Sequence, residues 1–334
     1  MKFLGDVRKK DLAGKTCLLR ADFNVESAKD ALRVEATIPT VKFLLKNGAR
    51  ILILSHRGRP KGVDEKLSLK VFIPFLKKNL KQEIHFLAGL PAKLGAGKIF
   101  LMENLRFWPE EEVDGKDFAR HLAKLGDFYV NDAFAVSHRA NASITQLPQL
   151  LPAYAGLLLQ KEIKTLSLVM KKPKKPLVLI FGGSKVDDKA PVIKYLLPKA
   201  NKVLLGSSVL NNSATLPKSS KIERPIDWLA EGSLAMDIGS LTVERYGAEI
   251  QKAKTIVWNG PVGKFEDKKY AGGSAALAKL VAKSGAFSVI GGGETTQLIL
   301  SLGLRKKIGF LSTGGGAMLE FLAGKKLPGI EALK

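Results

Sequence analysis

The chain has 334 residues, of which 46% are hydrophobic and 25% are charged. At about 150 residues per domain this length predicts two domains, and the composition excludes both an intrinsically disordered chain and a small scaffold held together by disulfides. The 54 basic and 31 acidic residues give a net charge of +23, which points to an anionic partner.

The single cysteine, Cys17, cannot form an internal disulfide, and the four histidines do not have the spacing of zinc ligands. The apolar runs are far shorter than a membrane span, and the first residues lack the apolar stretch of a signal peptide. We therefore expect a cytoplasmic protein with a reduced thiol, no membrane contact and no structural zinc.

Short apolar runs bounded by turn residues predict strands along the whole chain, within residues 16–24, 49–55, 98–104, 127–132, 176–183, 202–206, 254–260, 286–293 and 308–316. Segments with helical periodicity lie between many of them, at residues 38–48, 116–126, 190–200 and 273–285. The last segment has Ser274 as a predicted capping residue and Gly285 as a closing glycine. This alternation predicts an α/β fold with two Rossmann-like three-layer domains, each built on a parallel sheet.

A connector separates the two sets of predicted strands. Helical periodicity runs from about residue 153 to residue 170 and ends at a proline-lysine stretch that cannot continue a helix. We predict an N-terminal domain over residues 1–152, a connecting hinge helix over 153–172 and a C-terminal domain over 173–327. The tail, from about residue 328 to 334, is expected to pack on the first domain.

Charged and polar residues follow the predicted strands of the first half. Of the basic residues only 12 are arginine, and nine of these precede residue 150. The residues at the strand ends are Arg20, Asp22, Asn24, His56, Arg57, Arg59, Arg106, His138 and Arg139. Any one of these could be a solvated side chain in a turn, but cations at successive strand ends predict a pocket for a small molecule with more than one negative group.

Glycine-rich loops follow the predicted strands of the second half, at residues 182–185, 258–263, 291–294 and 312–317. Glycine lets the backbone approach a phosphate closely, and a following helix offers unpaired N–H groups. No Walker A pattern and no complete GxGxxG is present. One such loop is usually only a tight turn, whereas four in one half predict a polyphosphate site. An acidic substrate in one domain and a nucleotide in the other suggest a kinase that closes around both.

The motifs also carry a resemblance. In chain order, RADFNV, LRVEATIPTVKFLL, SHRGRPKG, ENLRF, NDAFAVSHRA, GGSKVDDK, AKTIVWNGPVGKFE, VIGGGETT and STGGGAMLEFLAGKKLPG resemble the phosphoglycerate kinase family over nearly the whole chain. The resemblance implies reversible phosphoryl transfer between 1,3-bisphosphoglycerate and ADP, with Mg²⁺, giving 3-phosphoglycerate and ATP in glycolysis. We expect a monomer.

The resemblance also implies roles for individual residues. The phosphoglycerate would be held by Asp22, Asn24, Arg33, His56, Arg59, Arg106 and Arg139. The nucleotide would contact Gly183, Lys185, Lys189, Asn259, Pro261, Glu266, Gly293, Glu294 and Thr295, with Glu294 near the metal. The transferring phosphoryl group would be surrounded by Arg33, Lys185 and the amides of Gly292, Gly293, Gly315 and Gly316. The acceptor carboxylate is already ionised, so positioning and charge neutralisation suffice, and His56 and His138 are expected to be hydrogen-bonding or structural residues.

Three features depart from the family pattern. Glu294 stands where the family usually has aspartate, so it either reaches the metal or only caps the helix that follows it. Residues 206–239 replace a longer, partly helical interval, so the second domain is predicted to be trimmed near the adenine pocket. Asn141 stands where histidine is usual. These departures leave open an alternative function, a non-catalytic scaffold that binds nucleic acid or another polyanion through its positive charge. The retained Arg33, Lys185 and both glycine loops oppose this alternative and favour catalysis, so nucleic acid is not the expected partner.

Overall fold

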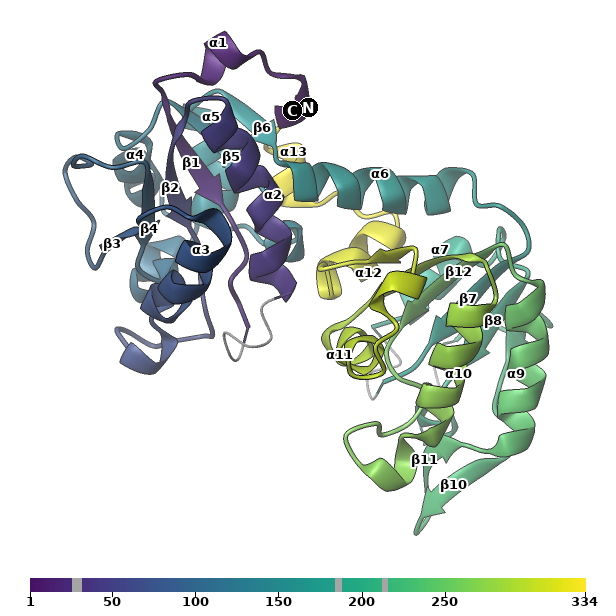
Figure 1. Cartoon of the computed structure of the whole chain (residues 1–334). Helices are drawn as coiled ribbons and strands as arrows, with labels where there is room; N and C mark the ends of the chain where they lie inside the picture. The colour runs from purple at the N-terminus through teal and green to yellow at the C-terminus, as the bar shows by residue number, and fades with distance from the viewer. Residues whose placement is uncertain (26–31, 184–187, 212–215) are drawn as a thin grey trace. The chain divides into compact units, whose positions relative to one another are not determined.

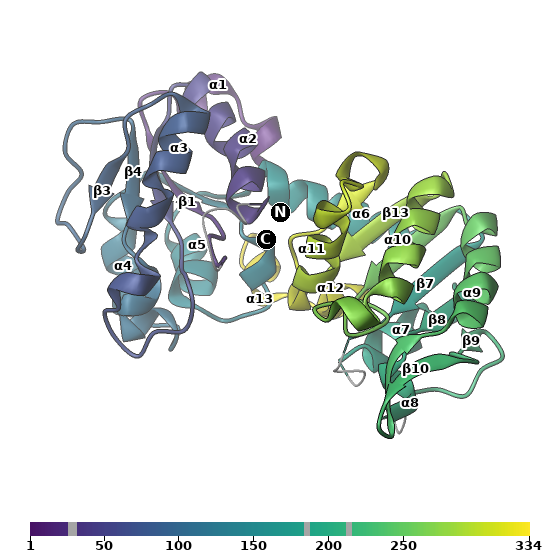
Figure 2. The ribbon, with the colours of Figure 1, turned by 60° about the horizontal axis from the view of Figure 1, so that its bottom comes forward.

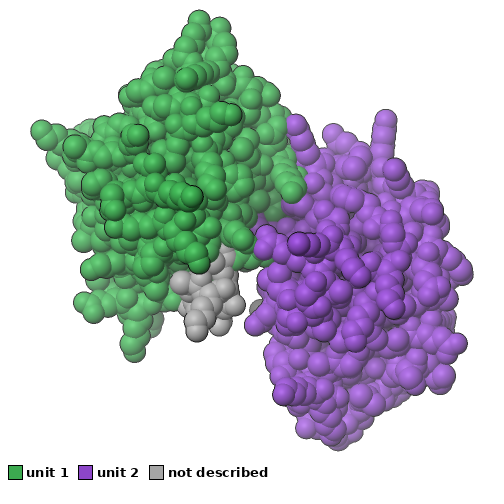
Figure 3. Space-filling view, viewed as in Figure 1, with its two compact units in different colours: residues 1–163, 326–334 green, residues 164–325 purple. Residues whose placement is uncertain are grey.

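The strands form two parallel sheets, one in each of two units. The computed structural model describes residues 1–25, 32–183, 188–211 and 216–334. Unit 1 contains residues 1–163 and 326–334, and unit 2 contains residues 164–325 (Figure 3). This is the α/β architecture that the alternating pattern predicted. Within the described part of the chain, no helix combines the length and the apolar character needed to cross a membrane.

The sheet of unit 1 has the strand order β3-β4-β2-β1-β5-β6, and all neighbours are parallel. Its strands are β1 (Thr16–Arg20), β2 (Arg50–Leu54), β3 (His85–Leu87), β4 (Ile99–Met102), β5 (Phe128–Asn131) and β6 (Ala153–Ala155). The helices α2 (Leu32–Lys46) and α3 (Ile73–Leu80) cover one face, and α4 (Lys116–Ala123) and α5 (Leu147–Leu150) cover the other (Figure 1). Because both faces are covered, the central strands have apolar interiors, at residues 17–19 of β1 and 51–54 of β2.

The sheet of unit 2 has the strand order β14-β13-β12-β7-β8-β9, again parallel throughout. Its strands are β7 (Leu177–Phe181), β8 (Lys202–Leu205), β9 (Ile222–Glu223), β12 (Thr255–Asn259), β13 (Phe287–Gly291) and β14 (Phe310–Leu311). The chain leaves β7 towards β8 on one side and later returns to β12 on the other. The crevice where this order reverses is the usual ligand site of such sheets.

Helices cover both faces of the second sheet as well. The helices α9 (Ser240–Lys252), α10 (Gly272–Lys283) and α11 (Gly293–Ser301) share one core with the strands, and Figure 2 shows α9 and α10 side by side. The helices α7 (Ala190–Leu196) and α12 (Gly316–Leu322) pack together on the other face. The three-layer prediction is confirmed for this unit.

The remaining elements connect the units or lie at their margins. They are α1 (Lys9–Leu12), α6 (Leu157–Lys171), α8 (Ser208–Asn211) and α13 (Pro328–Glu331), with the antiparallel hairpin β10 (Trp228–Glu231) and β11 (Leu234–Ile238). The long helix α6 contributes residues to both units. In α13, the Gly329 amide donates to the Ser137 carbonyl at 2.8 Å, and Asn131 Nδ2 donates to the Gly329 carbonyl at 3.2 Å, so the C-terminal segment packs on unit 1.

The structure corrects three local predictions. Ala153–Ala155 forms strand β6 instead of the start of a helix, because it pairs with the free edge of β5. Ser274 does not cap α10; it is the third helical residue, and its hydroxyl accepts hydrogen bonds from the amides of Val262 and Gly263 at 2.9 and 3.3 Å. The short strands β3 and β9 were not predicted, because pairing rather than composition defines them. Gly285 does close α10, with φ +68°.

A buried carboxylate holds the first turn of α6. Asp132 follows β5 and is fully buried, and its Oδ1 accepts from the amides of Leu158 at 2.9 Å and Leu159 at 3.2 Å. A Cβ on Gly156 would lie 2.1 Å from the same oxygen, so glycine is needed there. Burial raises the pKa of Asp132 to about 7, although Thr40 and the two amides lower it.

This carboxylate predicts a pH-dependent stability. The pKa of Asp132 is higher in the folded than in the unfolded chain. Its contribution to the free energy of unfolding is therefore fully present below about pH 4 and is lost as the pH rises through 7. The loss is at most about 4 kcal/mol. Asp132→Asn keeps an acceptor for α6 and removes the charge, so urea unfolding should increasingly favour the variant over the wild type between pH 4 and pH 8. Asp117→Asn, at an exposed position of α4, is the control; an Asp132→Asn difference that is the same at both pH values would contradict the prediction.

Candidate functional sites

The strands β1, β2, β4 and β5 of unit 1 end in one cluster of polar side chains. Asp22 is 3% exposed, and its Oδ2 lies 3.0 Å from Arg33 Nη1 of α2. The same Arg33 nitrogen donates to the carbonyl of Asn24 at 3.1 Å, and the Asn24 amide donates to Asp22 Oδ1 at 3.0 Å. The buried carboxylate therefore orients the guanidinium, which remains 26% exposed. Among the described residues its other donors have no partner, so they can bind an anion.

The loops after β2 and β4 are tied to this group. The Gly58 amide donates to Asn24 Oδ1 at 2.8 Å, and Arg106 Nη1 donates to the Gly58 carbonyl at 2.5 Å. Arg106 also pairs through Nε with Glu112 Oε1 at 3.0 Å. Asn104 Oδ1 accepts from the amides of Arg57 and Arg106 at 3.2 and 3.1 Å, which joins the two loops. Three strand ends thus form one rigid cluster.

His56 is a neutral hydrogen-bond donor within this cluster. Arg20 Nη2 lies 3.3 Å from His56 Nδ1, and since arginine can only donate, Nδ1 is the acceptor. Burial, followed by the charges of nearby arginines including Arg106 and Arg139, holds the pKa of His56 well below its usual range. The ring proton therefore belongs on Nε2, which is buried and has no hydrogen-bond partner among the described residues. A buried N–H without a partner among four cations is suited to bind an acidic ligand.

The two remaining predicted residues of this site are less constrained. Arg59 is exposed, and Arg139 is half-buried and near enough to lower the pKa of both His56 and Arg106. Neither guanidinium is in an ion pair within the described residues. Asp22, Asn24, Arg33 and Arg106 are therefore brought together by direct or one-step contacts. His56 and Arg139 lie near enough to act on them electrostatically, and Arg59 is exposed next to Gly58.

A buried support beneath His56 was not predicted from the sequence. Arg20 is 1% exposed, lies 3.5 Å from Glu111 Oε1 and donates through Nε to Ser143 Oγ at 2.7 Å. The Ser143 hydroxyl and amide donate to the two oxygens of Glu111 at 2.6 and 2.9 Å. Asn141, the departure from the family pattern, is also buried here and donates to the Glu111 carbonyl at 3.2 Å. A sequence signal existed only for Arg20, because Glu111 and Ser143 lie far from it along the chain.

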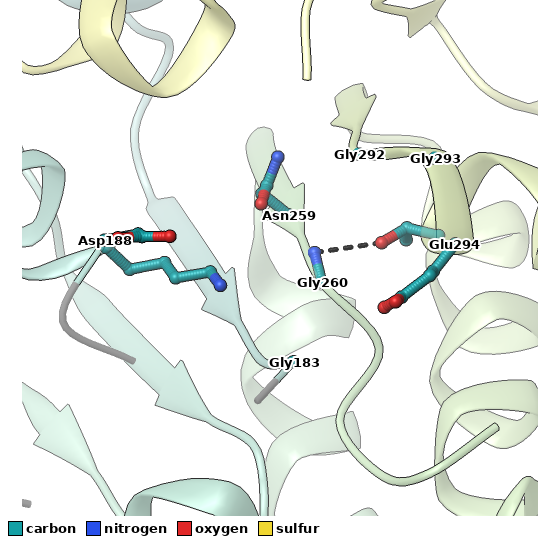
Figure 4. A pocket seen from close by; sticks show the side chains of 9 residues that line it. Gly183, Asp188, Asn259, Gly260, Gly292, Gly293 and Glu294 are labelled. Atoms are coloured by element: carbon teal, nitrogen blue, oxygen red, sulfur yellow. Dashed lines mark hydrogen bonds between the residues drawn. The ribbon is translucent and has the colours of Figure 1, made fainter. Parts of the chain in front are cut away.

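Unit 2 has a pocket of about 360 Å³ at the point where its strand order reverses. It is lined by Gly183, Asp188, Lys189, Asn259, Gly260, Gly292, Gly293, Glu294 and Thr295 (Figure 4). These residues lie at or after the ends of β7, β12 and β13, three neighbouring strands of the sheet. The pocket is thus built from three of the glycine-rich loops that the sequence singled out.

Close backbone packing explains why two positions of these loops need glycine. A Cβ on Gly182 would lie 1.9 Å from the carbonyl oxygen of Pro261, and a Cβ on Gly260 would lie 2.2 Å from that of Gly182. Gly260 also has φ +85°. Its amide donates to Thr295 Oγ1 at 2.9 Å, the bond drawn in Figure 4. The loops after β7 and β12 therefore approach closely and stay open towards a ligand.

The donors and charges of this pocket suit a polyphosphate. Gly292 has φ +96° and precedes α11, whose first-turn amides, at Gly293 and Glu294, carry a partial positive charge. Asn259 is 5% exposed, and its Nδ2 is buried with no hydrogen-bond partner in the part of the chain that the structure describes. Lys189 is also buried and lies beside Gly183. Amides, an unpaired donor and an ammonium group therefore line one cavity.

Glu294 is one of the two carboxylates that line this pocket, with Asp188. Burial raises its pKa, the nearby Glu266 raises it further, and Lys189 lowers it. Within the described residues Glu294 accepts no hydrogen bond, and no group of three or more His, Cys, Asp or Glu side chains is arranged to hold a metal by itself. Two carboxylates that repel each other fit a hard cation such as Mg²⁺, provided that phosphate oxygens complete its coordination.

Not every predicted residue lines the pocket. Lys185 lies outside the described residues. Pro261 contributes a carbonyl that accepts from the Gly183 amide at 2.7 Å. Glu266 acts on Glu294 electrostatically, whereas Gly315 and Gly316 lie at the start of α12, after the edge strand β14.

Comparisons with known proteins agree with this architecture. The family model described as "Phosphoglycerate kinase" matches residues 7–223 and 207–325. A phosphoglycerate kinase from Leptospira biflexa is 38% identical over 385 residues, covering 98% of this chain and 97% of that protein. Because this alignment is longer than the chain itself, the chain lacks internal residues that the relative has. The family match divides at residues 207–223, inside the interval predicted to be trimmed.

Solved structures are similar over the same extent. The structure of phosphoglycerate kinase from Coxiella burnetii has a TM-score of 0.83 at 30% identity and covers 99% of this chain and 98% of that chain. The crystal structure of the kinase from Pyrococcus horikoshii has a TM-score of 0.87 at 30% identity, with 100% and 98% covered. Both units of this chain are therefore similar to parts of full-length relatives.

Proposed function

The chain belongs to the phosphoglycerate kinase family, and we propose that it transfers a phosphoryl group reversibly between 1,3-bisphosphoglycerate and ADP, giving 3-phosphoglycerate and ATP. The observation that best supports this reaction is the pair of candidate sites, one at the carboxyl ends of the strands in each unit. One site is rich in arginine around a neutral His56, and the other is a glycine-lined pocket at a helix N-terminus.

In unit 1 the proposed ligand is the phosphoglycerate. Arg33, Arg106, Arg139 and Arg59 would neutralise its carboxylate and phosphate, and His56 would donate from Nε2. Asp22 and Asn24 orient Arg33 through their contacts at 3.0 and 3.1 Å. A guanidinium forms paired hydrogen bonds to carboxylate or phosphate, so several arginines favour a small molecule with both groups.

In unit 2 the proposed ligand is the nucleotide. The α11 amides, Asn259 Nδ2 and Lys189 would bind its phosphates, and Thr295 supports the Gly260 loop. Lys185, Pro261, Glu266, Gly315 and Gly316 keep the roles that the family resemblance implies. Mg²⁺ beside Glu294 would neutralise phosphate charge when the nucleotide is bound.

The chemistry of this reaction needs no general base. The acceptor is an ionised carboxylate, so its oxygen attacks directly, and the protein has to align the reactants and stabilise negative charge. The low pKa of His56 agrees with this role, because a neutral ring donates a hydrogen bond without taking up the proton of the reaction. Arg33 and the glycine amides would stabilise the transferring phosphoryl group.

The direct test is a coupled assay of ATP-dependent 3-phosphoglycerate phosphorylation with Mg²⁺, run beside other small acids and other nucleotides. We expect turnover with 3-phosphoglycerate that other acids do not match. Equal rates with unrelated carboxylic acids, or no turnover by a folded protein, would refute the proposed reaction.

Transfer also requires the two ligands to meet, and we propose that α6 acts as the hinge between units 1 and 2. Each ligand should bind alone, whereas both together should make the protein more compact. Small-angle scattering can measure the radius of gyration with neither, either and both ligands. Identical dimensions in all four states would count against hinge closure.

The role of Glu294 can be measured through the magnesium dependence of turnover. Glu294→Asp should keep or lower the Mg²⁺ concentration for half-maximal activity, whereas Glu294→Gln should raise it about tenfold by removing charge from a hard-cation site. Glu244→Gln, at an exposed position of α9, is the matched control. If all three variants equal the wild type, Glu294 only favours the start of α11 electrostatically.

We also propose a cytoplasmic monomer. The buried, unpaired Cys17 is in keeping with a reducing compartment.

A further inference from the structure

The proposed kinase sites do not account for most of the positive charge, and part of it gathers on one edge of unit 2. The strands β7, β12, β13 and β14 are all preceded by lysines. Because these strands are parallel, their amino ends lie on the same edge of the sheet, the edge opposite the nucleotide pocket. We call the exposed side chains there the lysine edge: Lys174, Lys175, Lys254, Lys283, Lys306 and Lys307.

Backbone contacts show that the lysine edge is continuous. The Lys254 amide donates to the Pro176 carbonyl at 2.9 Å, and the Thr255 hydroxyl donates to the Lys174 carbonyl at 2.8 Å. The Phe287 amide donates to the Lys254 carbonyl at 3.0 Å. A Cβ on Gly309, which follows Lys306 and Lys307, would lie 2.9 Å from the Phe287 ring. At about 4.8 Å between strands, the four strand starts span about 15 Å.

Little negative charge offsets these lysines. None of the six is in an ion pair within the described part of the chain. Two carboxylates of the same unit are already engaged in ion pairs. Glu223 is buried and pairs with Lys202 and Arg245, and Glu249 pairs with Lys252 at 3.1 Å. The edge therefore presents a row of uncompensated charges, which is the surface that a polyanion requires.

One aromatic ring lies within this row. Phe287 begins β13 and is 37% exposed, with Lys254 on the neighbouring strand and Lys283 at the end of α10. An exposed ring among lysines matches the surfaces that bind single-stranded nucleic acid, where phosphates meet the charges and a base stacks on the ring. An anionic bilayer would instead favour an amphipathic helix with a broad apolar face.

We propose that the lysine edge and Phe287 bind single-stranded nucleic acid through its phosphates and one stacked base, independently of base sequence. Because this surface lies at the opposite edge of the sheet from the nucleotide pocket, binding there leaves the pocket accessible. The protein would then be both a kinase and a nucleic-acid-binding protein, and its unusual net charge of +23 would have a function.

The test uses the full chain and a fluorescently labelled 12-nucleotide oligodeoxythymidylate, with anisotropy measured over a salt series. Lys175→Gln, Lys254→Gln and Lys307→Gln combined should weaken binding about tenfold and reduce the slope of log K against log salt by about 2. Phe287→Leu keeps an apolar side chain without the ring and should weaken binding severalfold. The rate of 3-phosphoglycerate phosphorylation should stay unchanged in both variants, so this outcome is separate from the test of the kinase.

A matched control removes the same charge elsewhere. Lys93→Gln, Lys98→Gln and Lys124→Gln combined change three exposed lysines of unit 1. This variant should weaken oligonucleotide binding less than threefold. Equal weakening by both triple variants would show that charge acts diffusely and would overturn the proposal. It would also be overturned by no oligonucleotide binding at low salt, by an unchanged affinity of Phe287→Leu, or by binding to phosphatidylserine vesicles in place of the oligonucleotide.

Discussion

Arg33→Ala is expected to lower kcat by about 10³ while the fold remains intact, because one guanidinium at the transferring phosphoryl group contributes about 10³ to 10⁵ in rate. The structure gives this side chain a fixed place, with its Nη1 held by Asp22 at 3.0 Å and by the Asn24 carbonyl at 3.1 Å. Within the described residues its remaining donors have no hydrogen-bond partner. The measurement is the coupled assay at saturating substrates, so that a loss of kcat is separated from a rise of KM.

Two further variants isolate the reason for that loss. Arg33→Lys keeps the charge but not the planar fork and should recover only part of the rate. Arg33→Ala combined with Asp22→Asn removes the buried carboxylate that the single variant leaves without a counter-charge, so it should restore stability without restoring turnover. A loss of less than tenfold in the single variant would rule out a direct role at the phosphoryl group.

Glu111→Gln is expected to lower the free energy of unfolding by about 3 kcal/mol, because it leaves the charge of Arg20 buried without its partner. Arg20 and Glu111 are each 1% exposed, and their closest atoms are 3.5 Å apart. Burial raises the pKa of Glu111, and the charge of Arg20 opposes that rise. The amide oxygen of glutamine can still accept from the Ser143 amide, and its NH₂ group can donate to the Ser143 hydroxyl oxygen, so the loss reports mainly the missing charge.

The measurement is urea unfolding at pH 7, with Glu110→Gln as the control. Glu110 is the exposed neighbour of Glu111, and its replacement should change stability by no more than about 0.5 kcal/mol. Equal stabilities of the two variants would mean that Arg20 does not depend on Glu111. Because Arg20 also contacts His56 Nδ1, a raised KM for 3-phosphoglycerate should accompany the loss of stability.

The strand predictions succeeded where the signal was local. The apolar run of Leu177–Phe181 is fully buried by helices on both faces, so its composition alone indicates a central strand. The prediction failed at Ala153–Ala155, because that segment is a strand only through its pairing with β5. The hairpin of β10 and β11 was not predicted either. Its residues lie within 206–239, the interval that replaces a longer segment of the family.

The same division holds for the sites. Charged residues after strands of one half and glycines after strands of the other predicted both candidate sites, because parallel strands bring successive carboxyl ends to one edge. The neutral state of His56 could not be predicted in this way. It depends on Arg20, and Arg20 depends on Ser143, 123 residues further along the chain.

The sequence by itself determined the alternation of strands and helices, the division into two domains and the residue types at each set of strand ends. These features follow from periodicity, turn residues and composition within short windows. The tertiary structure alone decided the strand order, the tautomer of His56, the buried support around Glu111 and the gathering of lysines beside Phe287. Each of these features arises from contacts between residues far apart in the chain. The energies of such contacts depend on burial and distance, and a short window of sequence contains no information on either.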